Sequence, residues 1–270
     1  MCWAGALDGS RAVIRRALVL CVAALALAPG GEEPFDVEEL VRRAEDALRG
    51  KTAEIRAAMT ITTPRWTRVV RFHSWDDRLG DRSFIRIIDP RKDRGTGFLR
   101  LEQTFWTYLP RVERTMRIPP SMMLQPWMGS DFTNDDLTRE SSMIDDYVPR
   151  ALGEKPIDGV AALGVELIPK EEAPVVWARV ELWLEKERLA PLLFLYFDEP
   201  EPGRYELLRR LIFSDVRVVA GRPLPHSWVV VPIDKPGQST RMVIESVELD
   251  QAFEDSIFTQ ANLRRVEGVR

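Results

Sequence analysis

The sequence predicts a mainly β fold of the α+β class in a single domain. From Ile55 onward, apolar and polar residues alternate with a period of two, and turns rich in Asp, Gly and Pro separate the alternating runs. One amphipathic helix precedes these runs, and one irregular segment with helical character interrupts them. Because the sequence contains no internal repeat, low-complexity tract or linker, we expect one domain rather than two.

Residues 1–28 are expected to be a secretory signal peptide. Three arginines precede an unbroken apolar run at residues 17–28, which ends in the small-x-small pattern of Ala26 and Ala28. A membrane anchor needs about 18 or more apolar residues, and this run is shorter. Lipid attachment at Cys21 is disfavoured because Leu20 stands where a small residue is required. We therefore expect cleavage beside Ala28 and release of residues 29–270 into the periplasm.

Cysteine content and charge exclude several classes of protein. Cys2 and Cys21 are the two cysteines, and both lie in the expected signal peptide. The mature chain would then have no disulfide, no thiol catalysis and no cysteine-metal site. The formal net charge is −4, and no lysine-rich run is present, so a nucleic-acid partner is not expected.

The mature chain begins with an amphipathic helix. Asp36 can cap its first turn, Glu39 can complete a capping box, and Gly50 ends it. The expected apolar stripe consists of Val37, Leu40, Val41, Ala44 and Leu48.

Two groups of strands follow the helix. The first comprises residues 55–61, 66–75, 82–89, 95–102, 103–110 and 112–118, and the second comprises residues 162–168, 175–185, 190–198, 205–219, 224–232 and 240–249. Residues 255–263 are expected to form a turn of helix. Several strands, such as residues 191–197, are apolar on both faces, whereas an antiparallel sheet usually has one polar face. The additional apolar surface must either close a barrel core or line a cavity for an apolar ligand.

The stretch between the two groups, residues 117–137, combines prolines with large apolar side chains. Pro119, Pro120 and Pro126 exclude an internal strand or a long helix. Methionine suits adaptable apolar surfaces, so the stretch is interpreted as a lid over a cavity. A loop that plugs the structure is the alternative. Residues 131–146 are expected to form one or two short helices with an acidic face.

No catalytic or metal-binding motif stands out. His73 and His226 lie on separate strands without a partner at metal-ligand spacing, and we expect them at strand edges or on the surface. The paired aspartates at residues 76–77, 135–136 and 145–146 each lie beside a turn or a helix start, where Asp serves as a cap. Residues 95–97 are glycine-rich, but a strand rather than a helix follows them. We therefore expect no enzyme activity, no metal and no cofactor.

Two motifs carry a resemblance to a known family. The Trp-x-Tyr-Leu-Pro turn at Trp106–Pro110 and the sequence GSDFTNDDL at Gly129–Leu137 resemble the outer-membrane lipoprotein-sorting protein family, which is LolA-like, and more closely its treponemal-domain branch. The resemblance implies a single half-open antiparallel β-barrel of about eleven strands, with an N-terminal helix and lid helices. It also implies a carrier of acyl chains and brings no catalytic residue with it.

The expected ligand and lid residues are the large apolar side chains of the lid and of the strands before it. They are Phe98, Leu101, Trp106, Tyr108, Met116, Met122, Met123, Leu124, Trp127, Met128 and Phe132. Which of them line the cavity individually is left open by the sequence.

The function that we expect is a monomeric periplasmic carrier of lipid or lipoprotein acyl chains toward the outer membrane. Its expected partners are the acyl chains and an inner-membrane transporter, of the RND type or of the lipoprotein-releasing type. The first alternative is a non-catalytic accessory protein of an RND-type envelope export complex. The second is a secreted hydrolase that uses a carboxylate pair.

Overall fold

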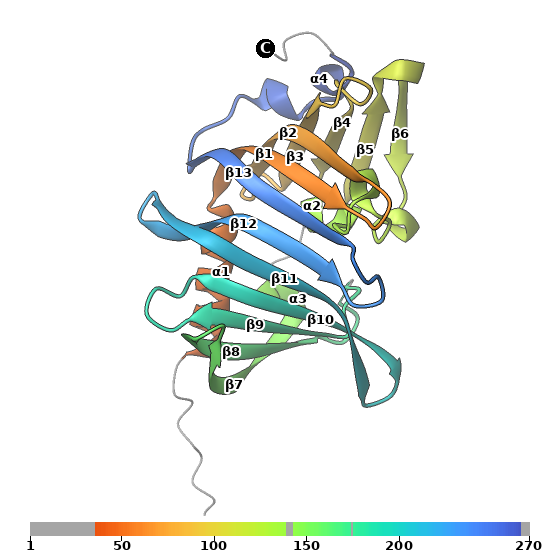
Figure 1. Ribbon diagram of the computed structural model, residues 1–270. Helices are drawn as coiled ribbons and strands as arrows, with labels where there is room; N and C mark the ends of the chain where they lie inside the picture. The colour runs from red at the N-terminus through yellow and green to blue at the C-terminus, as the bar shows by residue number, and fades with distance from the viewer. Residues whose placement is uncertain (1–35, 139–142, 174, 266–270) are drawn as a thin grey trace, which may run out of the picture. The chain divides into compact units, whose positions relative to one another are not determined.

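The computed structural model describes residues 36–138, 143–173 and 175–265 (Figure 1). The expected signal peptide lies outside these residues. The described residues all belong to one compact unit. Within the described ranges, no helix is both long enough and apolar enough to cross a membrane.

Helix α1, Val37–Arg49, begins and ends at the residues that the sequence indicates. The Asp36 carboxylate accepts a hydrogen bond from the Glu39 backbone N–H at 3.1 Å, and Gly50 ends the helix with a φ of 64°. The Glu39 side chain contacts Arg42 and Arg43 one turn further on. The expected reciprocal capping bond is thus replaced by ion pairs, since two cations compete for the same carboxylate.

The strands form one antiparallel sheet of thirteen strands, which confirms the mainly β fold class. They are β1 Thr52–Thr62, β2 Thr67–Asp77, β3 Arg82–Asp89, β4 Gly97–Leu101, β5 Thr104–Leu109, β6 Arg114–Ile118, β7 Tyr147–Ile157, β8 Val160–Pro169, β9 Arg179–Glu185, β10 Pro191–Glu201, β11 Arg204–Val219, β12 Arg222–Pro232 and β13 Ser239–Leu249. The order across the sheet is β6-β5-β4-β3-β2-β1-β13-β12-β11-β10-β9-β8-β7. Strands β6 and β7 are the two edges, so the barrel is half-open.

The sheet has thirteen strands rather than about eleven, and the expectation omitted β7 altogether. Pro149 and Pro156 argue against a strand, and Gly153 lies next to a register shift in the pairing with β8. Prolines are tolerated here because β7 is an edge strand, where backbone N–H groups on one side need no partner.

The two groups of strands meet at one seam. Every other pair of neighbours is consecutive in the chain, whereas β1 pairs with β13 along most of its length, from Ala53 opposite Leu249 to Thr62 opposite Ser239. The seam joins the first strand to the last.

The stretch between β6 and β7, residues 119–146, is here called the crossover segment, because it has to pass from one edge of the sheet to the other. It contains the short helical turns η2 Pro120–Met122 and η3 Trp127–Gly129 and the helices α2 Asn134–Thr138 and α3 Met143–Asp146. The acidic short helices expected at residues 131–146 are therefore present, with residues 139–142 outside the described part.

The two faces of the sheet have different covers. Helix α1 packs on one face, here called the inner face, together with the crossover segment, and most of the buried apolar side chains belong to this layer. The opposite, outer face carries a smaller cluster of Phe84, Leu99 and Tyr108 under η4 Asp255–Phe258 and α4 Gln260–Arg264. The helical turn expected at residues 255–263 thus covers the outer face of β3 to β5 and does not cover the doubly apolar strand β10.

Arg86 fixes the outer cover. Its guanidinium donates hydrogen bonds to the carbonyl oxygens of Gly95 at 2.7 Å, Leu263 at 3.0 Å and Asn262 at 2.6 Å. Burial lowers the pKa of Arg86 to about 10, so the side chain is still a cation at neutral pH. The guanidinium thus gives Leu263 at the end of α4 a donor and gives Asn262 a second one, since the Asn262 carbonyl oxygen also accepts from the Arg265 backbone N–H at 3.0 Å.

Candidate functional site

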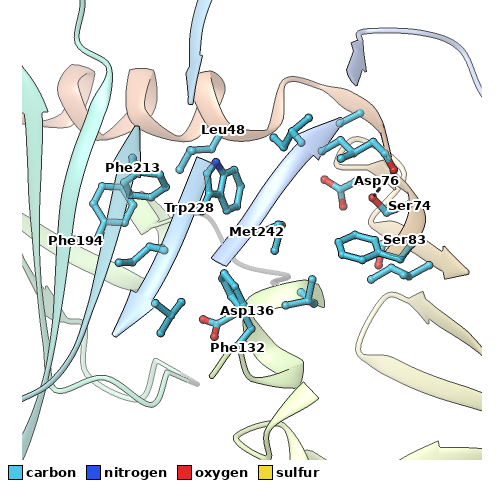
Figure 2. A pocket seen from close by; sticks show the side chains of 18 of the residues that line it. Leu48, Ser74, Asp76, Ser83, Phe132, Asp136, Phe194, Phe213, Trp228 and Met242 are labelled. Carbon is cyan, nitrogen blue, oxygen red and sulfur yellow. Dashed lines mark hydrogen bonds between the residues drawn. The ribbon is translucent and has the colours of Figure 1, made fainter. Parts of the chain in front are cut away.

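A cavity of about 180 Å³ lies on the inner face, between the sheet, α1 and the crossover segment (Figure 2). Its lining residues come from α1 (Glu45, Leu48), β1 to β3 (Ala53, Ile55, Phe72, Ser74, Trp75, Asp76, Ser83, Ile85), the crossover segment (Phe132, Asp136, Leu137, Met143) and β10 to β13 (Phe194, Tyr196, Arg209, Leu211, Phe213, Trp228, Val230, Met242, Ile244). On most strands the lining residues are two apart, as expected for side chains that share one face.

The cavity wall is predominantly apolar. Three aromatic side chains from successive strands stack edge to face along it: the rings of Phe194 and Phe213 are 4.8 Å apart, and those of Phe213 and Trp228 are 5.6 Å apart. Met242 pairs in register with Trp228 on the neighbouring strand, and Leu48 of α1 also lies beside Trp228 (Figure 2). This part of the wall offers an apolar ligand contact surface without a competing polar group.

One end of the cavity is polar. Along β2, Phe72 is followed at the next inward positions by Ser74 and Asp76, and Asp76 pairs in register with Ser83 on β3. Figure 2 shows Ser74, Asp76 and Ser83 gathered at one end of the cavity, away from Phe194, Phe213 and Trp228. The Ser74 hydroxyl donates to the Ile55 carbonyl oxygen at 3.4 Å.

Glu45 brings another carboxylate to the cavity from α1. It is buried and accepts a hydrogen bond from the backbone N–H of Met143, the first residue of α3. The carboxylate therefore joins α1 to the far end of the crossover segment.

An ion pair holds the crossover segment over β11. The Arg209 guanidinium donates two hydrogen bonds of 2.6 Å to the Asp136 carboxylate and lies 4.3 Å from the ring centres of both Trp177 and Tyr196. Burial alone would lower the pKa of Arg209, but the charge of Asp136 and its hydrogen bonds hold that pKa above its usual value. Asp136 also caps α2, because its carboxylate accepts from the Thr133 N–H at 2.8 Å while its own N–H donates to the Thr133 hydroxyl.

The beginning of the crossover segment is fixed by Trp127 and Asp131. The Trp127 side chain is 1% exposed, and its ring centre lies 5.4 Å from the rings of both Phe72 and Phe98. The Asp131 carboxylate accepts hydrogen bonds from Thr240 at 2.7 Å and from Gln238 at 2.5 Å. The segment thus has an apolar anchor on β2 and β4 and polar anchors on β11 and β13.

A family model described as that of an uncharacterized protein matches residues 80–265, more than half of the chain. The chain belongs to this family. The resemblance to outer-membrane lipoprotein-sorting proteins, first indicated by two sequence motifs, is confirmed. No curated protein matches the sequence.

Solved structures support the fold of the family. A DUF1329 family protein from Desulfovibrio piger is 22% identical with a TM-score of 0.75, and the alignment covers 83% of this chain and 96% of that one. A protein described as an outer membrane lipoprotein-sorting protein domain, from Vibrio parahaemolyticus, is 23% identical over 85% of this chain and all of its own, with a TM-score of 0.71. A LolA superfamily protein from Nitrosomonas europaea is 18% identical over 84% and 99%, with a TM-score of 0.71.

The expected ligand residues of this family member fall into three groups. Phe132 lines the cavity, and Phe98, Met123, Trp127 and Met128 belong to the inner layer or pack against it. Met116, Met122 and Leu124 are exposed at or near the β6 edge. Leu101, Trp106 and Tyr108 belong to the outer-face cluster under the C-terminal helices. The role of these residues in binding stays a prediction.

The sequence patterns did not indicate the part of the cavity that β10 to β13 form, nor the polar end of the cavity on β2 and β3. Alternation along a strand separates two faces but does not tell which face is inner, because that depends on where α1 and the crossover segment pack. A signal was nevertheless present: Phe72, Ser74 and Asp76 follow one another at period two, which indicates a polar end on an otherwise apolar face.

The two histidines are buried rather than at the surface. His73 lies 2.7 Å from a Glu54 carboxylate oxygen, and its ring centre is 3.7 Å from that of Trp75. Burial lowers the pKa of His73, although its hydrogen bond to Glu54 acts in the opposite direction. The His226 ring nitrogen contacts the Leu224 carbonyl oxygen at 2.9 Å. In the described part of the chain, no three His, Cys, Asp or Glu side chains are grouped so that they could hold a metal ion.

Proposed function

We propose that this protein is a non-enzymatic carrier that binds acyl chains of lipids or lipoproteins in the inner-face cavity and moves them through the periplasm toward the outer membrane. The observation that carries the proposal is the cavity itself, whose wall is apolar and whose cover joins the two edges of an open sheet. The likeness to structures described as lipoprotein-sorting and LolA superfamily proteins supports the same class of ligand.

The energetics of such a carrier depend on the cavity volume. Hiding a sixteen-carbon acyl chain from water gains on the order of 12 kcal/mol, at about 0.8 kcal/mol per methylene group. Pockets that enclose a drug-sized ligand usually measure about 300–1,000 Å³. The cavity of about 180 Å³ is smaller. A long chain therefore binds only if the lining side chains or the crossover segment move, and the free energy of that movement lowers the affinity enough for release.

The lining contains side chains that can move. Leu137 and Met143 come from the crossover segment, and Met242 lies opposite them on β13. Methionine adapts its shape by rotation about three bonds, so Met143 and Met242 can make room for a chain at low cost. Enlargement toward the crossover segment would leave the sheet unchanged.

The experiment that tests the proposal combines extraction with a binding assay. The mature protein is purified from the periplasm and extracted for lipid mass spectrometry, and the delipidated protein is titrated with the uncharged apolar dye N-phenyl-1-naphthylamine. We expect co-purified lipid at a near-equal molar ratio and saturable dye fluorescence. Protein that is repeatedly free of lipid and does not bind the dye would refute the carrier.

The exposed apolar residues of the open edge favour a second function. Val112, Met116, Met122 and Leu124 are all more than one third exposed on β6 and the turns beside it. Such a patch suits docking onto a protein of an RND-type envelope export complex or a lipoprotein-releasing transporter. Capture of such a complex by lipid-free protein, abolished by Met122→Glu and Leu124→Glu together, would support this function over the carrier.

A further inference from the structure

A second space, of about 160 Å³, lies beside the cavity and is here called the rim hollow. Its described lining combines the crossover segment with β11, β12 and loop residues beside the strands: Leu124, Pro126, Ser130, Asp131, Phe132, Thr133, Trp177, Leu208, Arg209, Val230, Pro232 and Lys235. Leu124, Leu208 and Lys235 are exposed, so the rim hollow is open to solvent. Two exposed leucines from distant parts of the sequence thus lie at the mouth of one hollow.

A single layer of side chains separates the rim hollow from the cavity. Phe132, Arg209 and Val230 belong to the described lining of both spaces. All three are buried. Because each has one side toward the cavity and another toward the rim hollow, these three side chains form the partition between the two.

The movable part of this partition is the ring of Phe132. Arg209 is held by its ion pair, and Val230 lies within β12 between two paired strands. The backbone of Phe132 is fixed, since its N–H donates to the Ser130 hydroxyl at 3.1 Å and its carbonyl oxygen accepts from the Trp127 N–H at 2.8 Å. The ring itself has no hydrogen bond to lose, so it can change rotamer while the backbone stays in place. Such a rotation would join the two spaces.

Joining the two spaces reconciles the small cavity with a long ligand. The cavity, of about 180 Å³, and the rim hollow, of about 160 Å³, are each too small for a drug-sized ligand. Together they reach the lower end of the range of about 300–1,000 Å³ that such ligands need. An acyl chain that starts in the cavity would continue into the rim hollow and contact Leu124 and Leu208 there.

We infer that the rim hollow is the outer half of the acyl-chain site. An amphiphile with one long chain enters past Leu124 and Leu208, its chain end passes Phe132 into the cavity, and its head stays in water at the mouth near Lys235. The inference rests on the proposed carrier function and adds the entry path and the ligand class. Because the head stays in water, chain length should determine affinity and head-group chemistry should contribute little.

The first experiment locates the chain. Residues 29–270 contain no cysteine, so Leu208→Cys introduces a single thiol at the mouth, and Val218→Cys introduces one on the same strand outside the described lining of both spaces. Each variant is alkylated with iodoacetamide, with and without sixteen-carbon lysophosphatidylcholine below its micellar concentration. We expect the ligand to slow alkylation of the Leu208→Cys thiol at least about fivefold and to leave the Val218→Cys thiol unchanged, because thiol reactivity depends on access. Leu124→Cys gives a second measurement from the crossover segment.

The second experiment measures chain length and head group by displacement of N-phenyl-1-naphthylamine. Lysophosphatidylcholines of eight, twelve and sixteen carbons should bind progressively more tightly, because each added methylene moves from water into the joined spaces. Lysophosphatidylcholine and lysophosphatidylglycerol of equal chain length should differ by less than about threefold, since charges in water are screened. Leu208→Asn should weaken binding of the sixteen-carbon ligand about fivefold, and its control Val218→Asn should not. Circular dichroism and a melting curve establish that the variants are folded.

The outcomes separate this inference from the proposed function. If neither the dye nor any lysophospholipid binds the wild-type protein, the carrier function fails. If the sixteen-carbon ligand binds but protects neither the Leu208→Cys nor the Leu124→Cys thiol, the protein remains a carrier and the rim hollow is not part of its site. Equal protection of the Val218→Cys thiol, or an affinity set by the head group rather than by chain length, would also overturn the inference.

Discussion

The sheet has two covers that differ in how they are held. On the outer face, η4 and α4 pack so closely that a Cβ atom at Gly97 would lie 2.8 Å from both Leu263 and Arg86. On the inner face, the crossover segment is anchored at Trp127, Asp131 and Asp136 but leaves a cavity of about 180 Å³ beside these anchors. The close packing of the outer cover contributes to the stability of the fold. The inner cover leaves a cavity between its anchors, so it can contribute to ligand binding.

The largest expected effect concerns the apolar anchor of the inner cover. Trp127→Ala should lower the free energy of unfolding by about 3–5 kcal/mol, because the ring is buried against Phe72 and Phe98. Leu124→Ala, a few residues away and 49% exposed, should change it by less than about 0.5 kcal/mol. Urea unfolding measures both.

A loss below about 1 kcal/mol for Trp127→Ala would instead mean that the whole segment is a weakly attached lid, as the sequence alone suggested. In that case the inner cover would have no apolar anchor, and it would be attached to the sheet much more weakly than the outer cover.

Arg86→Met tests the outer cover. The carbonyl oxygens of Gly95, Asn262 and Leu263 would lose the hydrogen bonds of the guanidinium, and we expect a loss of stability of about 2–4 kcal/mol. Dye binding at the inner face should be unchanged in the folded protein. Arg91→Met at an exposed position serves as the control. Weakened dye binding in folded Arg86→Met would show that the two covers are coupled.

Arg209→Met breaks the polar anchor of the inner cover. The Asp136 carboxylate would lose its bidentate partner, and we expect about 2 kcal/mol of destabilisation, the size of a hydrogen bond to a charged group, together with faster release of bound dye, measured by stopped-flow fluorescence. Adding Asp136→Asn should recover part of the stability but not the slow release, because the charge left without a partner disappears while the anchor is still missing. An unchanged rate of dye release would mean that the Arg209–Asp136 ion pair does not limit the movement of the crossover segment.

The smallest expected effect depends on pH. Burial lowers the pKa of His73 in the folded protein, so the unfolded chain binds the proton more readily. The contribution of His73 to stability is therefore complete above the unfolded pKa of about 6.5 and decreases as the pH falls below it. Urea unfolding at pH 7.5 and pH 5 should show a smaller loss for His73→Gln than for wild type. An equal loss in the two proteins would contradict the burial effect.

The fold was more predictable from the sequence than the site. Alternation and turns identified twelve of the strands, and capping residues identified α1, because these signals are local in the chain. The β7 strand was missed since Pro149 and Pro156 are acceptable only at a sheet edge, which is a property of the whole sheet. The cavity combines α1 with strands far apart in the sequence. Leu101, Trp106 and Tyr108 were therefore grouped with Phe98 although they lie on the opposite face.

The seam between β1 and β13 has a consequence for the order in which the chain can fold. The first strand of the sheet cannot complete its pairing until the last strand has formed. The pairing of Ala53 with Leu249 closes a loop that contains all the other strands. Contacts of such long range make folding slow. While the chain is emerging from the ribosome or a translocation channel, β1 to β6 form at most a separate hairpin array with β1 as an unpaired edge, prone to pairing with other chains. A chaperone that holds the chain until β13 has emerged would therefore keep the β1 edge from pairing with other chains.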